Sequence, residues 1–363
     1  MKFPYSITLA SVAWTALAQS APVKPVADVL RYQPAVGVPS VKSWTAKHTL
    51  NMQGFTSKTA DDPLVTYPVT GKMESGQVLR VTDVPKALGE GRPLVLERRF
   101  DTISSEATLA LSGEVQDERK ASLASSLEGA EVRYTWVPEE EAYGKFFYGE
   151  EGDESELAPL GEDMDLRCVL PKEPVELGST WMVAAEDLVH LLAPCGEVQL
   201  RTAEGSDKRL SRSLRFGLGG GLEYAFGGKS QAECSITWAE NKEVNGQSCA
   251  VLNVVVDGRF VGEKNEILGE DVLMGEALRG ARFDRVEIAL RLEGRGVVLW
   301  NLDANQAHSM DLALAEDATL RVFELAPDGR EMVQNLRMRG LLKLGYGVEP
   351  PAAGPVLEHA GER

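Results

Sequence analysis

Long stretches of this sequence alternate apolar and polar residues with a period of two. Residues 131–137 read EVRYTWV and residues 285–292 read RVEIALRL. Successive side chains of a β-strand point to opposite faces, so the pattern indicates strands with one buried face and one solvated face. Such strands are typical of antiparallel sheets, because parallel sheets are usually covered on both faces. We therefore expect a mainly β protein.

The C-terminal part predicts a meander of wide strands. Its turns are expected at Gly294, at Asn305 and at residues 327–329, where turn-forming residues occur. The expected strands are 284–293, 296–302, 308–315, 319–325 and 331–344.

Helices are few in this interpretation. Residues 155–169 and 184–192 have helical spacing, and residues 207–216 and 265–278 are weaker candidates. Runs of strands separated by short helical segments predict an α+β protein of the mainly β kind. The expected architecture is large curved antiparallel sheets or half-barrels with a few helices packed on one side. Whether the strands form one large sheet or two domains stays open at this point.

The N-terminus is typical of a secretory signal peptide. Lys2 precedes an uncharged apolar stretch, and Ala16-Leu17-Ala18 provides a small-residue cleavage pattern, so we expect cleavage after Ala18 and export to the periplasm or the extracellular space. No later run is apolar enough to span a bilayer. The expected organisation is a signal peptide at 1–18, a linker at 19–27, an N-terminal antiparallel β unit at 28–170, a C-terminal β-rich unit with helices at 171–348 and a disordered tail at 349–363.

Composition argues against disorder and against two classes of binding partner. The chain of 363 residues is 43% hydrophobic, which argues against disorder. It carries 38 basic and 55 acidic residues, a net charge of −17. Binding to nucleic acid or to anionic lipid draws on clustered Lys and Arg, so this balance argues against both partners.

Four cysteines are disulfide candidates in an exported protein. We expect neighbours to pair, Cys168 with Cys195 and Cys234 with Cys249. Strand-like runs at 233–238 and 248–256 are joined by a turn-rich link at 241–247 that contains Asn245-Gly246, and a hairpin there could bring the second pair together. Four buried free thiols are the alternative. No CxxC occurs and no nearby His completes a ligand set, so we expect no metal and no cofactor.

Motifs for catalysis are weak. His308 and Asp311 would point to opposite faces of a strand, which rules out a triad, and the glycine run at 217–221 has neither a P-loop ending nor a dinucleotide fingerprint. The acidic segment 139–165 suits either calcium or a solvated loop, without EF-hand spacing. The remaining histidines, none of which completes a site, are His48, His190 and His359.

Two blocks of sequence carry a resemblance to known proteins. Residues 163–166, 170–171 and 175–181 form the first block, and residues 292–303 with the return strand 308–314 form the second. Both blocks are similar to those of uncharacterised secreted bacterial proteins with no assigned function. The strand-turn-strand of the second block also resembles, more loosely, the half-barrel lipid carriers of the periplasm of the lipoprotein-localisation type.

Tryptophans are candidates for lining a ligand cavity. Large rings on the inner face of a curved sheet can shelter an acyl chain, or they can simply fill the core. The leading hypothesis is an exported, non-catalytic protein of the cell envelope that binds an apolar small molecule or lipid. The alternatives are a structural module with a filled core that binds a partner protein, and, third, an enzyme. The candidate cavity residues are Trp44, Trp136, Trp181, Trp238 and Trp300.

Overall fold

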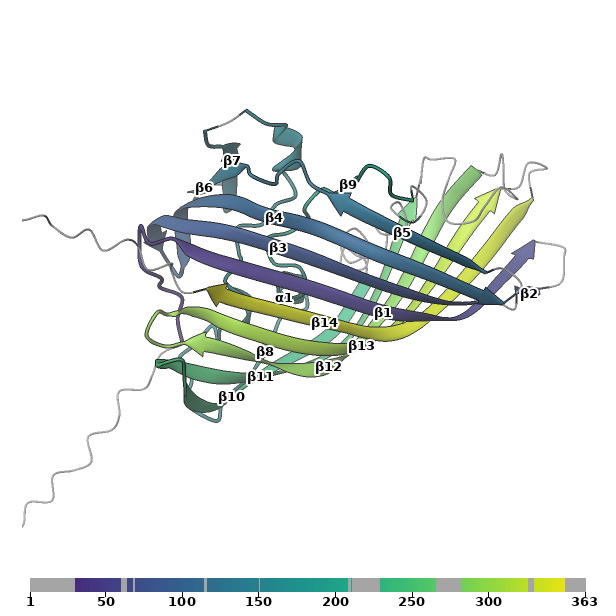
Figure 1. Ribbon diagram of the computed structural model, residues 1–363. Coiled ribbons are helices and arrows are strands. Elements are labelled where there is room, and N and C mark those ends of the chain that lie inside the picture. Colours follow the sequence, from purple (N-terminus) through teal and green to yellow (C-terminus); the bar gives the residue numbers. More distant parts are fainter. Residues whose placement is uncertain are drawn as a thin grey trace, which may run out of the picture.

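The computed structural model describes residues 30–59, 64–67, 69–113, 116–149, 151–207, 210, 229–265, 282–325 and 330–349. Within these residues the chain forms one antiparallel sheet of 14 strands, which confirms the expected mainly β fold with few helices. Figure 1 shows the strands running the length of the molecule. The order along the sheet is β7-β6-β4-β3-β1-β14-β13-β12-β11-β10-β8, with β2 on β1 and with β5 between β4 and β9.

The strands are unusually long, and several exceed 18 residues. The bounds are β1 Ser40–Thr59, β2 Val65–Tyr67, β3 Val69–Gly89, β4 Arg92–Gly113, β5 Asp117–Ala124, β6 Glu131–Val137, β7 Ala142–Phe147, β8 Thr180–Val183, β9 Arg201–Thr202, β10 Lys229–Val244, β11 Gln247–Asn265, β12 Arg282–Asn301, β13 Gln306–Leu325 and β14 Glu331–Glu349. The helical elements are short: η1 Glu154–Glu156, η2 Arg167–Val169 and α1 Leu188–Leu192.

Pairing of β1 with β14 joins the two halves of the chain. The ladder runs from the Val41–Glu349 pair to the Thr59–Met332 pair. Strands from both sides of the expected boundary at 170/171 therefore share a single sheet, which answers the open question of one sheet or two. That boundary falls in the connection between β7 and β8.

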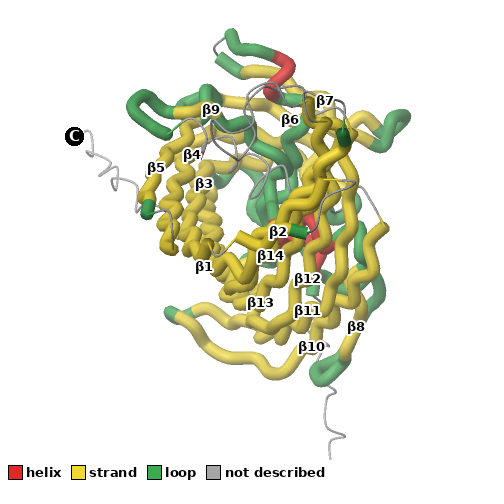
Figure 2. Tube along the Cα trace, turned by 90° about the vertical axis from the view of Figure 1, so that its right-hand side faces the viewer, coloured by secondary structure: helices red, strands yellow, loops and turns green. Residues whose placement is uncertain are grey.

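The sheet curls around an interior, as Figure 2 shows when the molecule is viewed from its end. Glycines within the strands allow the backbones to approach closely on the inner face. A Cβ atom at Gly294 would lie 2.1 Å from the carbonyl oxygen of Ala313, and one at Gly340 would lie 1.8 Å from that of Thr49. Glycine in a strand interior typically marks such a bend or close approach.

Residues 151–200, here called the insert, connect β7 to β9 and contribute β8 to the sheet. Their apolar side chains pack on the concave face in the same core as β1, β3, β4 and β10–β14. Figure 2 shows loops and a short helical segment inside the curl. The concave face is therefore covered by the chain's own residues at one end of the sheet.

Three sequence predictions need correction. The expected turn at Gly294 is absent, because β12 passes straight through this residue, and the five expected strands are the three strands β12, β13 and β14. The expected helix at 155–169 is replaced by η1 and η2, because the Asp163 carboxylate accepts hydrogen bonds from the backbone N–H groups of Asp165 and Arg167 and Leu166 adopts a left-handed φ of 53°.

Of the other expectations, one is confirmed, one is confirmed in part and several are untested. The turn at Asn305 is confirmed by its positive φ, and the expected helix at 184–192 is reduced to α1. Several predictions fall outside the described residues: the signal peptide, the linker, the tail after Glu349, the glycine run at 217–221, the turn at 327–329, His359 and nearly all of the helices expected at 207–216 and 265–278.

Candidate functional site: the concave face of the sheet

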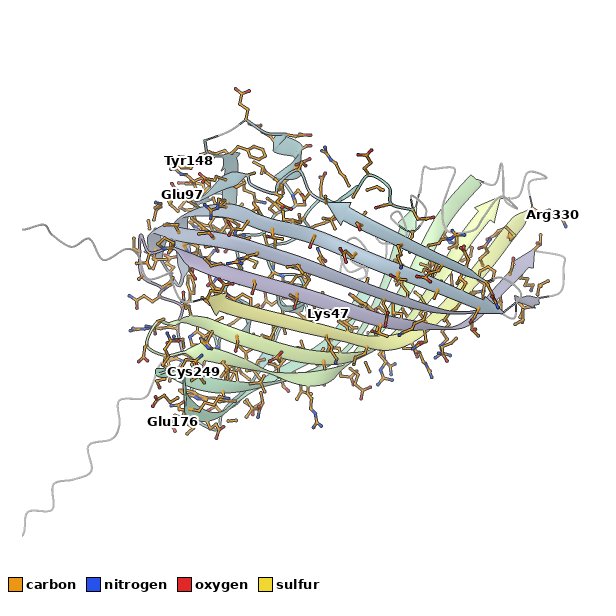
Figure 3. All side chains as sticks on the ribbon, viewed as in Figure 1. Lys47, Glu97, Tyr148, Glu176, Cys249 and Arg330 are labelled. Carbon is orange, nitrogen blue, oxygen red and sulfur yellow. The ribbon has the colours of Figure 1, made fainter. Side chains whose placement is uncertain are left out.

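The concave face has two regions, which differ in how deeply their side chains are buried. The packed end carries the tryptophans of β1, β10 and β12 and lies under the insert. Figure 3 labels Cys249 at this end of the sheet and Arg330 at the other. Beyond the core, towards Arg330, the same face continues with half-buried apolar side chains and then with buried residues such as Phe55 and Val322.

A cluster of buried charges, here called the latch, lies at the packed end. It consists of Lys42 on β1, Asp83 on β3, Arg98 on β4 and Asp165 of the insert. The ammonium of Lys42 lies 2.8 Å from Oδ2 of Asp83 and 2.8 Å from Oδ2 of Asp165. All four side chains are buried, and their two positive and two negative charges balance.

All three guanidinium nitrogens of Arg98 donate hydrogen bonds. It bonds Asp83 through Nε at 2.7 Å and through Nη2 at 2.9 Å, which is the bidentate geometry that favours Arg with carboxylates. It also donates to the backbone carbonyls of Gly161 and Glu162 and to Sγ of Cys195. The latch thus fastens the insert to the sheet.

Neighbouring charges shift the pKa values of Asp83 and Lys42 in the latch. Burial alone would raise the pKa of Asp83, but Arg98 and Lys42 outweigh burial and hold this pKa below its usual value. Burial would lower the pKa of Lys42, yet Asp165 and Asp83 raise it overall. The cluster is a structural clamp, since every charge in it already has a partner of opposite sign.

Sequence reasoning missed the latch because its members are far apart in the chain. A signal was present, however. Lys42 occupies a concave-face position of β1, two residues before Trp44, and Asp83 and Arg98 occupy corresponding positions after Val81 and before Phe100. A charged residue at a position that the alternation assigns to the buried face predicts a buried partner.

The apolar band is the second region of the concave face. It comprises half-buried apolar residues that cross the sheet in register, from β4 to β12. Met52 lies opposite Met338, and Leu336 lies opposite Leu320. These side chains contact solvent on the face that at the packed end forms the core. The band consists of Leu109, Leu111, Met73, Met52, Met338, Leu336, Leu320 and Ile288.

A polar pair lies between the packed end and the apolar band. Nδ1 of His48 on β1 lies 3.0 Å from Oε2 of Glu316 on β13, and both side chains are 6% exposed. On the intervening β14, the residue opposite Glu316 is Gly340, which has no side chain to separate them. Leu342 and Leu314 flank the pair.

Three of the five candidate tryptophans are core residues. Trp44, Trp238 and Trp300 are at most 5% exposed. Nε1 of Trp238 donates to Oδ1 of Asn241, and Nε1 of Trp300 donates to the carbonyl of Arg31. Nε1 of Trp44 is buried, and no residue in the described part of the chain hydrogen-bonds it. Their rings fill the packed end.

The other two tryptophans are partly buried. Nε1 of Trp181 on β8 donates to the carbonyl of Val169 and so ties the insert to the sheet edge. Trp136 on β6 lies under the guanidinium of Arg92, 4.2 Å from the ring centre, and meets the edge of Tyr143. A cavity-lining role for the five tryptophans stays a prediction.

A cavity of about 480 Å³ opens where strands end at the packed end. Turns and strand termini line it, including Tyr32, Asn245, Asp303 and His308, and none of the five tryptophans does. His308 is half-buried there and is the extra residue of the bulge between the Leu299–Ser309 and Trp300–Ala307 pairs. The cavity lies away from the apolar band.

The four cysteines are free thiols. The Asn245-Gly246 hairpin forms as expected, but its register places Cys234 opposite Val256 and Cys249 opposite Lys242. Eight residues of strand, or roughly 26 Å, separate the two positions, so the predicted Cys234–Cys249 bridge is wrong. In place of the predicted bridge to Cys168, Cys195 contacts Arg98. Burial raises the pKa of Cys234 to about 12.

Two acidic residues of the segment 139–165 make structural contacts. Glu156 is buried and accepts a hydrogen bond from Oγ of Ser126 and pairs with Arg201. Asp163 caps the turn before η2 and pairs with Arg167. In the described part of the chain, no group of three His, Cys, Asp or Glu residues is arranged to hold a metal ion. None of the helices in those residues is long and apolar enough to cross a bilayer.

Comparisons with known proteins add little. No family model and no curated protein matches the chain. Among solved structures, an outer membrane channel from Pseudomonas putida F1 aligns with 87% of this chain and 97% of its own, at 6% identity and a TM-score of 0.21. At that score the likeness carries no conclusion about fold or function. The resemblance to secreted bacterial proteins stays a prediction.

Proposed function

We propose that this chain is an exported, non-catalytic protein of the cell envelope that holds an apolar ligand on the concave face of its sheet. The observation that carries the proposal is the apolar band. At the packed end the chain covers its own apolar face, whereas in the band the same face stays half-buried. Large apolar surfaces left in contact with water mark interaction sites in soluble proteins.

The composition of the band suits a variable ligand. Met52, Met73 and Met338 lie together with leucines on adjacent strands. Methionine is flexible and polarizable, so it adapts to ligands of different shape. The convex face, in contrast, carries charged pairs such as Asp317 with Arg337 and Arg339. The binding face and the water-exposed face are therefore chemically distinct.

A second candidate function is favoured by the sheet edge. β8 is the last strand of the sheet, and Met182 on it is 59% exposed. An edge strand with exposed apolar side chains can accept a strand from a partner protein. In that case the chain is an interaction module and the apolar band holds no small ligand.

Mass spectrometry of an organic extract tests the two candidates. The full chain without its expected signal peptide is purified without detergent, extracted and compared with an identical extract of an unrelated acidic protein. A reproducible stoichiometric lipid or apolar metabolite supports the carrier. Absence of any such molecule, together with failure to bind a fluorescent apolar probe, contradicts the carrier and leaves the interaction module.

A further inference from the structure

The polar pair gains a third member from the neighbouring strand. Ser75 on β3 lies directly opposite His48 on β1, and both side chains are on the concave face. Residues opposite each other in an antiparallel pair have Cβ atoms about 4.5–5.5 Å apart. The three side chains of Ser75, His48 and Glu316, here called the polar trio, thus lie side by side across β3, β1 and β13.

The trio has unused hydrogen-bonding capacity. Ser75 is only 7% exposed, and its Oγ has no hydrogen-bond partner among the described residues. Nδ1 of His48 hydrogen-bonds Oε2 of Glu316, while no described residue hydrogen-bonds Nε2. A buried hydroxyl without a partner lowers stability. Unpaired buried polar groups are rare in folded proteins, so the hydroxyl of Ser75 calls for a functional explanation.

The chemistry of the trio fits a ligand oxygen. The hydroxyl of Ser75 can donate to an oxygen atom, and Nε2 of His48 can donate to the same group or accept its proton. Glu316 fixes the imidazole ring so that Nε2 is presented to that position. A carboxyl or a hydroxyl group satisfies both partners, whereas a quaternary ammonium group satisfies neither.

The position of the trio links it to the apolar band. Met73 is two residues from Ser75 on β3, and Leu109 lies opposite Met73 on β4. Both belong to the band and both are half-buried. A chain lying on the band therefore ends beside the trio, where the face changes from apolar to polar and then meets the core.

We propose that the polar trio binds the oxygen head group, a carboxyl or a hydroxyl, of an amphiphile whose hydrocarbon chain lies on the apolar band. This inference rests on the proposed carrier function and names its ligand class. The net charge of −17 would by itself favour a cationic head group and disfavour an anionic one. Preference for a carboxylate would therefore come from the polar trio and not from the electrostatic field of the whole protein.

Calorimetric titration with three probes of equal chain length tests the inference. The probes are dodecanoic acid, dodecanol and dodecyltrimethylammonium, each kept below its micelle concentration. We expect the full mature chain to bind at least one of the first two roughly tenfold more tightly than the third, a difference that one good hydrogen-bonded contact supplies. The first two probes distinguish a carboxyl from a hydroxyl ligand.

Ser75→Ala isolates the trio. The change removes an unpartnered hydroxyl and leaves the fold intact, so the variant should bind the preferred probe about fivefold more weakly and the ammonium probe unchanged. Ser104→Ala on β4 is the control, because Ser104 is a half-buried serine at a convex-face position, opposite the exposed Val78, and should bind like the wild type.

The outcomes separate the two proposals. Equal affinity of the wild type for all three probes, with no effect of Ser75→Ala, would overturn the head-group site and leave the carrier standing. Failure of the wild type to bind any probe would contradict the carrier itself, and with it the inference that rests on it.

Discussion

Arg98 and Asp83 face each other across β3 and β4 with two hydrogen bonds of 2.7 and 2.9 Å, and both side chains are fully buried. The pair stands at the centre of the latch, where Lys42 and the insert meet it. A buried ion pair adds little net stability compared with apolar residues, but removing one partner leaves an uncompensated charge.

Asp83→Asn should therefore destabilise the protein by about 3–5 kcal/mol, because it leaves Arg98 and Lys42 buried without their shared counterion. Urea denaturation followed by tryptophan fluorescence measures the change. Asp317→Asn is the matched control: Asp317 also binds two arginines, but at the solvated convex face, and should cost at most about 1 kcal/mol. Equal losses for the two variants would contradict the structural role of the latch.

Low pH should reduce the stability that the latch contributes. Arg98 and Lys42 depress the pKa of Asp83 against the effect of burial, and Arg167 does the same for Asp163. A depressed carboxyl pKa contributes stability that is present above the unfolded value of about 4 and is lost as the pH falls through the folded value. The urea midpoint should stay level from pH 7 to pH 5 and fall below about pH 4. A midpoint unchanged at pH 3 would argue against ionised partners.

Gly294→Ala should lower the free energy of unfolding by about 1–3 kcal/mol, since its Cβ would lie 2.1 Å from the Ala313 carbonyl oxygen. Gly76→Ala on β3 is the control, because a Cβ there meets no atom within 4 Å. Thermal unfolding of the two variants compares them. Similar melting temperatures would show that the close approach of β12 and β13 is not needed.

The cysteines should be unreactive in the folded protein. Burial raises the pKa of Cys234 to about 12 and also raises that of Cys195, so neither forms much thiolate near pH 8. We expect an alkylating reagent to modify all four thiols after unfolding without reductant and few before. Peptide mapping that finds a Cys234–Cys249 bridge would contradict the register of β10 and β11.

Much of the sheet could be predicted from the sequence, because alternation is a local property. It assigned residues 131–137 and 285–292 to strands with one buried face, and Asn245-Gly246 to a hairpin turn. It failed at Gly294, where local turn propensity suggested a break and contact with β13 keeps the strand continuous.

The insert and the latch could not be predicted in the same way. Residues 155–169 have helical spacing, yet long-range contacts such as those of Arg98 with Gly161 and Glu162 hold them in an irregular form. Lys42 and Asp165 are separated by 123 residues, so no local pattern links them. The polar trio likewise needs the register of three strands, which His48 alone does not reveal.

Binding of a neutral fluorescent probe, N-phenyl-1-naphthylamine, tests the proposed ligand face most directly. Leu336→Gln changes the apolar band on the concave face of β14, and Leu341→Gln changes a leucine of the same strand that is 37% exposed on the convex face. We expect the first variant to bind the probe about fivefold more weakly, since part of an apolar contact is lost, and the second to bind like the wild type. Equal affinities for the wild type and both variants, or no binding by the wild type, would contradict the concave face as the ligand site.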